Sequence, residues 1–157
     1  AEKFAYLMVT TPGSVCPVPV VFHDLLPTFS KLAGVEERLP AEVDGGDFSH
    51  LLHGGEMPVK RRFPGLLFHF PHYQGESPQS ALRIGNLKVL LTYEEGRVEL
   101  FDLAEDPCET TDISAQQPGK TAELAELLRH QLAAVGAELP KENPDFRPEG
   151  PVPRPRR

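Results

Sequence analysis

The stretch SALRIGNLKVLLTYEEGRVELFDL, residues 80–103, decides the fold, because short apolar runs in it alternate with tight-turn residues. Gly85-Asn86 and Glu95-Gly96 are typical turn pairs. Every second side chain from Leu87 to Tyr93 falls on one face, as in a half-buried strand. Connections this short allow only antiparallel pairing. With one more apolar run upstream, the predicted strands are about 64–70, 80–84, 87–94 and 98–103.

Two helices are predicted on either side of these strands. Asp24 is a favourable N-cap residue, and Gly34 ends the first helix. Its apolar stripe at helical spacing is Leu25, Leu26, Phe29, Leu32 and Ala33. A longer helix is predicted at about 121–135, capped by Thr121 and ended by Gly136. Its buried stripe is Leu124, Leu127, Leu128, Leu132 and Val135. The pattern predicts an α+β fold, a four-stranded antiparallel sheet packed against a long C-terminal helix, with an N-terminal helix and long loops.

Composition limits the possible functions. A chain of 157 residues fits one domain, and its formal net charge of -7 disfavours nucleic acid as a partner. No apolar run approaches the ~20 residues that span a bilayer. Cys16 and Cys108 are too few for a disulfide framework.

The chain divides by composition into three segments. Residues 1–21 are predicted to be extended, because Pro12, Pro17 and Pro19 interrupt them. Residues 22–139 hold the helices and strands, and residues 140–157 form a Pro-rich, basic, extended tail. The first residues contain neither an initiator Met nor a secretory signal, which predicts that the chain begins inside a longer protein.

The segment FHFPHY, residues 68–73, carries the candidate binding groups. His69, His72 and Tyr73 offer two imidazoles and a phenol, which can bind an anionic or hydroxylated substrate. The alternative is a pair of histidines whose ring nitrogens are satisfied at a strand end. A zinc site is disfavoured, because no cysteine or carboxylate cluster supplies further ligands.

In five segments, at residues 23–34, 44–54, 68–73, 80–90 and 99–109, the chain resembles, in the same order, the type I, arylsulfatase-like sulfatases of the alkaline phosphatase superfamily. Residues 23–34, HDLLPTFSKLAG, resemble that family's D-L-x-P-T-x-x-x-L-A-G helix. Residues 44–54, DGGDFSHLLHG, are similar to its D-G-x-S-x-x-x-L-L-x-G loop, with Asp47 in place of Ser. The segment 68–73 resembles W-H-F-P-H-Y, with Phe68 in place of Trp.

Two further segments complete the resemblance, which covers about residues 15–146. Residues 80–90, SALRIGNLKVL, resemble the family's A-I-R-x-G-x-Y-K-L-I hairpin. Residues 99–109, ELFDLAEDPCE, are similar to E-L-Y-D-L-x-x-D-P-x-E. Each segment alone is weak evidence, but five in the same order with compatible gaps identify the chain with the C-terminal part of such a sulfatase.

The resemblance implies a sulfatase C-terminal subdomain at 22–139, which leans on a larger α/β domain and helps to form the substrate cleft. Residues 1–21 would be a remnant of that large domain, the partner expected for this chain. The full-length enzyme would hydrolyse sulfate esters of a small molecule or sugar with formylglycine and calcium. On this resemblance His69, His72 and Tyr73 are predicted to bind substrate. Family members are usually periplasmic, secreted or lysosomal.

No catalytic or metal-binding residue is predicted in this chain. Formylglycine forms from a C/S-x-P/A-x-R motif, and neither Cys16, before PVPV, nor Cys108, before ETTD, fits it. The isolated chain is therefore predicted to be inactive, with no cofactor of its own. Two alternatives remain open, namely a free-standing, non-catalytic binding or interaction module derived from a sulfatase, and a phosphoesterase relative from the same superfamily.

Overall fold

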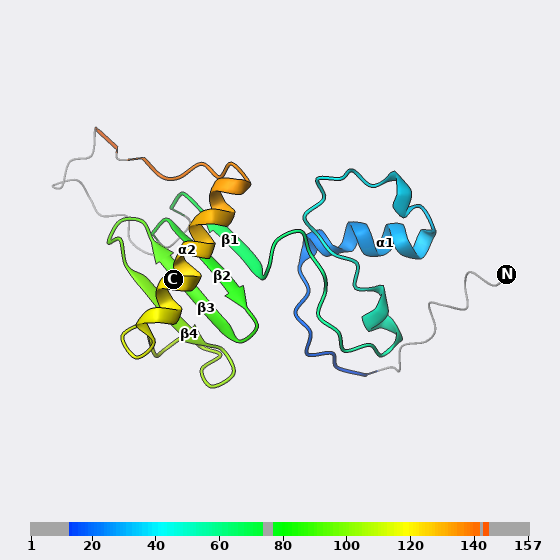
Figure 1. Ribbon diagram of the computed structural model, residues 1–157, viewed down its shortest axis with the longest axis horizontal. Coiled ribbons are helices and arrows are strands. Elements are labelled where there is room, and N and C mark those ends of the chain that lie inside the picture. The colour runs from blue at the N-terminus through cyan, green and yellow to red at the C-terminus, as the bar shows by residue number, and fades with distance from the viewer. Residues whose placement is uncertain (1–12, 74–76, 142, 145–157) are drawn as a thin grey trace. The chain divides into compact units, whose positions relative to one another are not determined.

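The computed structural model describes residues 13–73, 77–141 and 143–144 (Figure 1). The chain forms two compact units, residues 1–64 and residues 65–157. Most of the predicted extended segment and basic tail lies outside the described residues. The assignment of residues 22–139 to a single subdomain stays a prediction. No helix among the described residues is long and apolar enough to cross a bilayer.

The second unit contains the predicted antiparallel meander. Its strands are β1 (Leu66–Phe70), β2 (Gln79–Ile84), β3 (Leu87–Thr92) and β4 (Val98–Asp102), in the spatial order β1-β2-β3-β4. Leu82 pairs with Val89, and Val89 pairs with Leu100. The β2–β3 turn places Gly85 at φ 59°, a left-handed conformation that a residue with a Cβ rarely adopts. The predicted hairpin at Gly85-Asn86 is confirmed.

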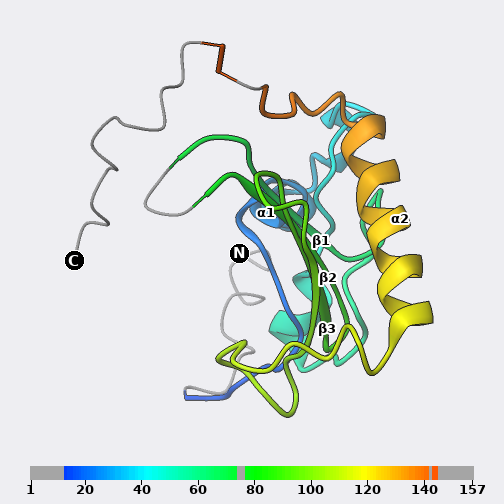
Figure 2. The same ribbon diagram turned by 90° about the vertical axis from the view of Figure 1, so that its left-hand side faces the viewer.

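Helix α2 (Pro118–Ala134) packs along one face of this sheet (Figure 2). Residues of the helix and sheet form one apolar cluster that consists of Leu82, Val89, Leu100, Leu124, Ala125, Leu128 and Leu132. Burial of such side chains is the main favourable term in folding. The α+β prediction is therefore confirmed, with Leu124, Leu128 and Leu132 of the predicted stripe in the core and Leu127 packed against it. Val135 was predicted to be buried but is exposed by 43%, at the residue that follows the end of α2.

The start of α2 differs from the prediction. The helix begins at Pro118, because proline suits the first turn, where its missing N–H has no helical partner in any case. Thr121 does not cap the helix. Its hydroxyl donates to the carbonyl of Gln117 at 2.8 Å, one turn earlier.

In its described residues, 13–64, the first unit contains α1 (Leu25–Ala33) and three 3-10 turns. These turns are η2 (Phe22–Asp24), η3 (Glu36–Arg38) and η4 (Ser49–His53). The helix lies where the sequence predicted it, but its predicted apolar face is largely exposed and a different face is buried. Pro27 and Thr28 are its buried residues, whereas Leu26 and Phe29 are exposed by 56% and 59%.

Candidate functional site

His69 lies at the centre of a polar network in the second unit. The residue sits in β1, opposite Ser80 of β2. Its Nδ1 is 2.6 Å from the Ser80 hydroxyl, and its Nε2 is 3.0 Å from the Glu138 carbonyl oxygen. Ser80 is buried, with 1% of its surface exposed. Its hydroxyl oxygen also lies 2.7 Å from the Tyr93 hydroxyl oxygen. The network joins β1, β2, the end of β3 and the segment after α2.

The hydrogen-bond partners of His69 indicate which ring nitrogen carries the proton when the ring is neutral. A carbonyl oxygen only accepts, so Nε2 donates to Glu138. Nδ1 then accepts from Ser80, and Ser80 in turn accepts from Tyr93. Both ring nitrogens of His69 are thus engaged within the fold, and its role in substrate binding stays a prediction.

His72 and Tyr73 follow the strand and are exposed. The Tyr73 hydroxyl donates to a carboxylate oxygen of Glu94, and this hydrogen bond raises the pKa of Tyr73 above its ordinary value of 10.0. His72 makes no hydrogen bond to the residues that the structure describes. Of the three predicted binding residues, His72 and Tyr73 present polar atoms to solvent, whereas His69 is held inside the network.

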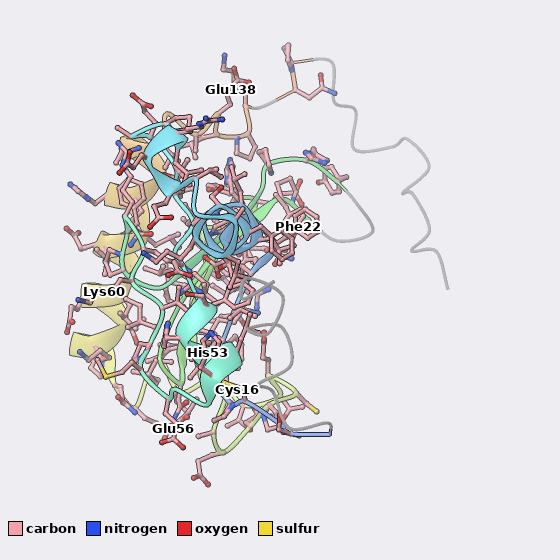
Figure 3. The ribbon with its side chains drawn as sticks, turned by 90° about the vertical axis from the view of Figure 1, so that its right-hand side faces the viewer. Cys16, Phe22, His53, Glu56, Lys60 and Glu138 are labelled. Atoms are coloured by element: carbon pink, nitrogen blue, oxygen red, sulfur yellow. The ribbon has the colours of Figure 1, made fainter. Side chains whose placement is uncertain are left out.

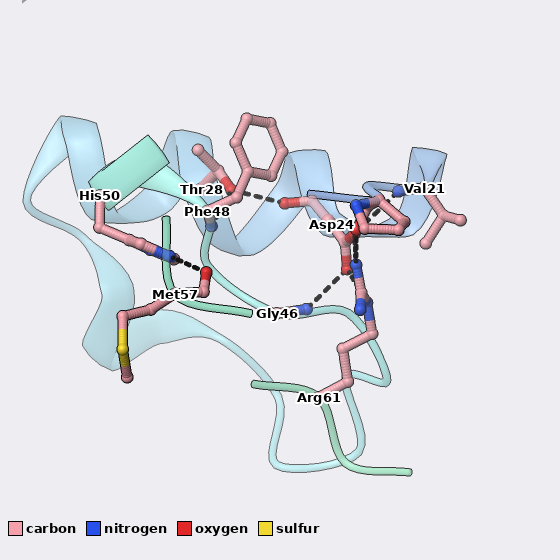
Figure 4. Close-up of polar contacts among 9 residues, drawn as sticks. Val21, Asp24, Thr28, Gly46, Phe48, His50, Met57 and Arg61 are labelled. Carbon is pink, nitrogen blue, oxygen red and sulfur yellow. Dashed lines mark hydrogen bonds and ion pairs between the residues drawn. The ribbon is translucent and has the colours of Figure 1, made fainter. Parts of the chain in front are cut away.

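A second polar centre organises the first unit. The Asp24 side chain is fully buried, and both its oxygens accept hydrogen bonds from Arg61, at 2.8 Å from Nε and 2.6 Å from Nη2 (Figure 4). The backbone N–H groups of Gly46 and Val21 also donate to the carboxylate, each at 2.9 Å. Four N–H donors therefore surround one buried anion.

The neighbouring residues extend this centre toward the predicted D-G loop. The Thr28 hydroxyl donates to the Asp24 carbonyl at 2.8 Å and accepts from the Phe48 N–H at 3.0 Å. A Cβ on Gly46 would lie 2.2 Å from the Lys60 carbonyl oxygen, so only glycine fits there. Two family-like segments, 23–34 and 44–54, thus meet through hydrogen bonds.

The role of Asp24 differs from the predicted helix cap. It occupies the N-cap position of α1, but its side chain makes no capping hydrogen bond there. Burial alone would raise the pKa of Asp24. The hydrogen bonds from Arg61, Gly46 and Val21 outweigh burial and lower the pKa below 3.8. The residue is thus a structural anion. No local sequence pattern marks Arg61 as its partner, because the two residues are 37 positions apart.

The described residues do not fit the calcium that the family resemblance implies. Calcium takes about six to eight oxygen ligands. No group of three or more His, Cys, Asp or Glu side chains is close enough among the described residues to hold a metal. The Asp24 oxygens are filled by N–H donors, and an oxygen of Asp106 accepts from the Thr110 and Thr111 N–H groups. Cys16 and Cys108 are both exposed, free thiols.

Replacement of Asp24 tests the buried ion pair. Asp24→Asn leaves the Arg61 guanidinium, whose side chain is 10% exposed, without its counter-charge. We expect a loss of about 3–5 kcal/mol in the first unit, typical for removal of one partner of a buried pair. Amide hydrogen exchange followed by NMR measures this in α1, with α2 amides as the internal reference. The matched control, Asp44→Asn, removes an exposed partner of Arg62 at 3.5 Å and should change little. An equal loss of stability in Asp24→Asn and Asp44→Asn would contradict a special role for Asp24.

The same carboxylate predicts acid sensitivity of the first unit. Because the folded pKa of Asp24 is below its ordinary value of 3.8, its contribution is fully present above that value. The contribution is lost as the pH falls through the lower, folded pKa. NMR resonances of α1 should therefore report unfolding in acid, at a higher pH than those of α2. The Asp24→Asn variant should lack this acid step. An α1 that melts identically in both proteins would refute the assignment.

The His69 network predicts different effects for the two histidines. His69→Ala removes partners from Ser80 and Glu138 and should cost about 1–3 kcal/mol of stability. His72→Ala, at an exposed position, should stay within about 0.5 kcal/mol. Urea unfolding followed by far-UV circular dichroism compares the two variants. If His69→Ala leaves the stability unchanged, the hydrogen bonds of the His69 ring are dispensable and its nitrogens are available to a ligand.

No protein-family model matches the chain as a whole or in part. Curated sequences do match. A sulfatase from Formosa agariphila is 32% identical over 142 residues, which cover 83% of this chain and 26% of that protein. Arylsulfatase K from Xenopus laevis is 27% identical over 128 residues, which cover 76% of this chain and 23% of that protein. The chain therefore spans about a quarter of the length of these relatives.

Solved sulfatase structures also match most of this chain and about a quarter of their own length. A 2-O GAG sulfatase matches 73% of this chain and 25% of its own, with a TM-score of 0.60 and 27% identity. BT4656, solved with its substrate D-glucosamine-2-N,6-O-disulfate, matches 70% of this chain and 23% of its own, with a TM-score of 0.57 and 26% identity. Sequence and fold together show that this chain resembles the C-terminal part of sulfatases, over about a quarter of the length of those proteins.

Proposed function

We propose that this chain is the C-terminal subdomain of a sulfuric ester hydrolase and that it completes the substrate cleft of the whole enzyme. The observation that carries the proposal is the match of its helices and four-stranded sheet to one quarter of a 2-O GAG sulfatase. Because a fold alone does not determine an activity, the order of the five family-like segments adds the necessary specificity. The reacting groups then belong to polypeptide outside this chain.

The substrate-facing part of this subdomain would be the end of β1 and the residues that follow. His72 and Tyr73 are exposed there, and an imidazole or a phenol can donate a hydrogen bond to a sulfate or sugar oxygen. His72 makes no hydrogen bond to the described residues, whereas the Tyr73 hydroxyl would have to leave Glu94 to reach a substrate. His69 would contribute by fixing the strand end through Ser80 and Glu138.

The chain by itself should be inactive toward sulfate esters. Sulfate-ester cleavage requires an activated nucleophile and a concentrated positive site for the developing charge. In the full-length enzyme, formylglycine would supply the nucleophile and calcium would contribute positive charge. Neither Cys16 nor Cys108 is followed by the sequence from which formylglycine forms. A sulfated sugar is the substrate class that the solved relatives support, since BT4656 was solved with a disulfated glucosamine.

A chimera tests the proposal. The matching segment of the Formosa agariphila sulfatase, which is 26% of that protein, is replaced by the corresponding part of this chain, in a host that forms formylglycine. We expect a soluble chimera that cleaves a sulfated glucosamine or an aryl sulfate, and an insoluble or inactive protein when the segment is only deleted. In the active chimera, His72→Ala or Tyr73→Phe should lower kcat/KM about tenfold or more, the effect of losing one hydrogen bond to a charged group.

Two results would overturn the proposal. Metal-dependent sulfate release by the isolated chain would put the reacting groups inside it. Full activity of the deletion variant would show that the segment does not complete the cleft. A folded but inactive chimera, together with binding of sulfated sugars by the isolated chain, would instead favour the free-standing binding module.

A further inference from the structure

Tyr73 and Glu94 meet at one end of the four-stranded sheet. Phe70, Gln79 and Thr92 stand opposite one another in β1, β2 and β3, so the residues after Phe70 and after Thr92 leave the sheet at the same end. The Tyr73 hydroxyl donates there to a carboxylate oxygen of Glu94. We call these two residues the Tyr73–Glu94 pair. The pair joins the candidate binding segment to the turn between β3 and β4.

The turn that carries Glu94 is held on both sides. The N–H of Thr92 donates to the Arg97 carbonyl at 3.0 Å and closes the turn. The N–H of Tyr93 donates to the Pro78 carbonyl, also at 3.0 Å, and ties the start of the turn to the residue before β2. Glu94 therefore extends from a backbone that the sheet fixes.

The end of β1 is held as well. Nε2 of His69 donates to the carbonyl oxygen of Glu138 at 3.0 Å, and Figure 3 shows Glu138 beyond the end of α2. Pro71 follows the strand, and its ring restricts the backbone before Tyr73. The Tyr73–Glu94 pair thus connects two segments that the second unit already holds in place.

Negative charge exceeds positive charge in the turn beside Tyr73. Arg97 lies 3.7 Å from Glu95 and 3.6 Å from Glu99, and it forms no ion pair with Glu94. Three carboxylates therefore share one guanidinium, and the charge of Glu94 has no basic partner among the described residues. A second anion close to Glu94 would be repelled.

Hydrogen bonding selects against an anion in the same way. While the Tyr73 proton is donated to Glu94, the phenol oxygen and the second carboxylate oxygen can only accept hydrogen bonds. An ionised sulfate group also only accepts, whereas a sugar hydroxyl or an ammonium group donates. The Tyr73–Glu94 pair is therefore complementary to a hydroxyl or an ammonium group and not to a sulfate.

We propose that the Tyr73–Glu94 pair is a specificity element, which binds an unsulfated hydroxyl or ammonium group of the substrate and rejects a second sulfate at that position. The inference rests on the proposed function, which puts the end of β1 in the substrate cleft. The preferred substrate is then a sugar that carries the sulfate to be cleaved and no sulfate where it reaches Tyr73. The disulfated glucosamine solved with BT4656 supplies the contrasting compound.

The test compares two sugars as competitors of the sulfate ester that the active chimera cleaves. D-glucosamine 6-sulfate has a free ammonium group, and D-glucosamine-2-N,6-O-disulfate carries a sulfate in its place. We expect the monosulfated sugar to inhibit the parent chimera at least tenfold more tightly than the disulfated sugar. Glu94→Gln should bring the two inhibition constants within about threefold, because the amide removes the charge and adds an N–H donor for a sulfate oxygen.

Glu95→Gln is the matched control. Glu95 lies in the same turn and carries the same charge, but it pairs with Arg97 and accepts no hydrogen bond from Tyr73. The control should keep at least a fivefold preference for the monosulfated sugar. If Glu94→Gln and Glu95→Gln reduce the preference equally, the effect is one of general charge, and the assignment to the Tyr73–Glu94 pair is wrong.

The isolated chain shows whether the pair forms in solution. The hydrogen bond to Glu94 raises the pKa of Tyr73 above 10.0, so Glu94→Gln should lower it toward that value. NMR titration of the Tyr73 ring measures this shift, and an unchanged circular dichroism spectrum shows that the variant is folded. A Tyr73 pKa that is the same in the parent and in Glu94→Gln would refute the pair.

The chimera also separates this inference from the proposed function. An active parent chimera that both sugars inhibit equally, or that neither inhibits, refutes the specificity element and leaves the proposed function intact. An insoluble or inactive parent chimera refutes the proposed function and the specificity element with it.

Discussion

The buried contact between Asp24 and Arg61 is the constraint on which the first unit depends. One carboxylate accepts four N–H donors and thereby joins the turn before α1, the D-G loop and the basic segment at residue 61. An unpaired charge in that position would be strongly unfavourable, so these segments must come together for the unit to fold. The orientation of α1, with its polar side inward, follows from this contact.

The two units are stabilised in different ways. In the second unit, leucine and valine side chains from three strands and α2 form one apolar core, and the hydrophobic effect suffices to specify it. Among the described residues of the first unit, the fully buried side chains are Asp24 and Thr28, and the buried apolar residues are Pro27 and Val59. A unit held mainly by hydrogen bonds, with its apolar residues outward, gains stability when another surface covers those residues.

The sequence predicted what depends on local patterns. The meander follows from alternation over a few residues and a Gly-Asn turn, and the core stripe of α2 follows from helical spacing. The start of α2 was missed by three residues, because the cap was assigned to Thr121 rather than the first turn to Pro118. The Asp24–Arg61 contact joins residues 37 positions apart, and no periodicity marks such a pair. The engagement of His69 by Ser80 and Glu138 is equally non-local.

The hydrogen bonds around Asp24 also explain what the resemblance in the family-like segments is evidence for. Asp24, Thr28 and Gly46 belong to two of those segments, and each makes a hydrogen bond that holds the loop against the helix. The side chains of Asp24 and Thr28 and the N–H of Gly46 are engaged in these hydrogen bonds and so are not available to a reacting molecule. Likeness in these segments is therefore evidence of a shared fold. Evidence for shared chemistry has to come from polar atoms that the frame leaves available. Among the three residues predicted to bind substrate, His72 meets this requirement, because the Tyr73 hydroxyl donates to Glu94 and both ring nitrogens of His69 are engaged.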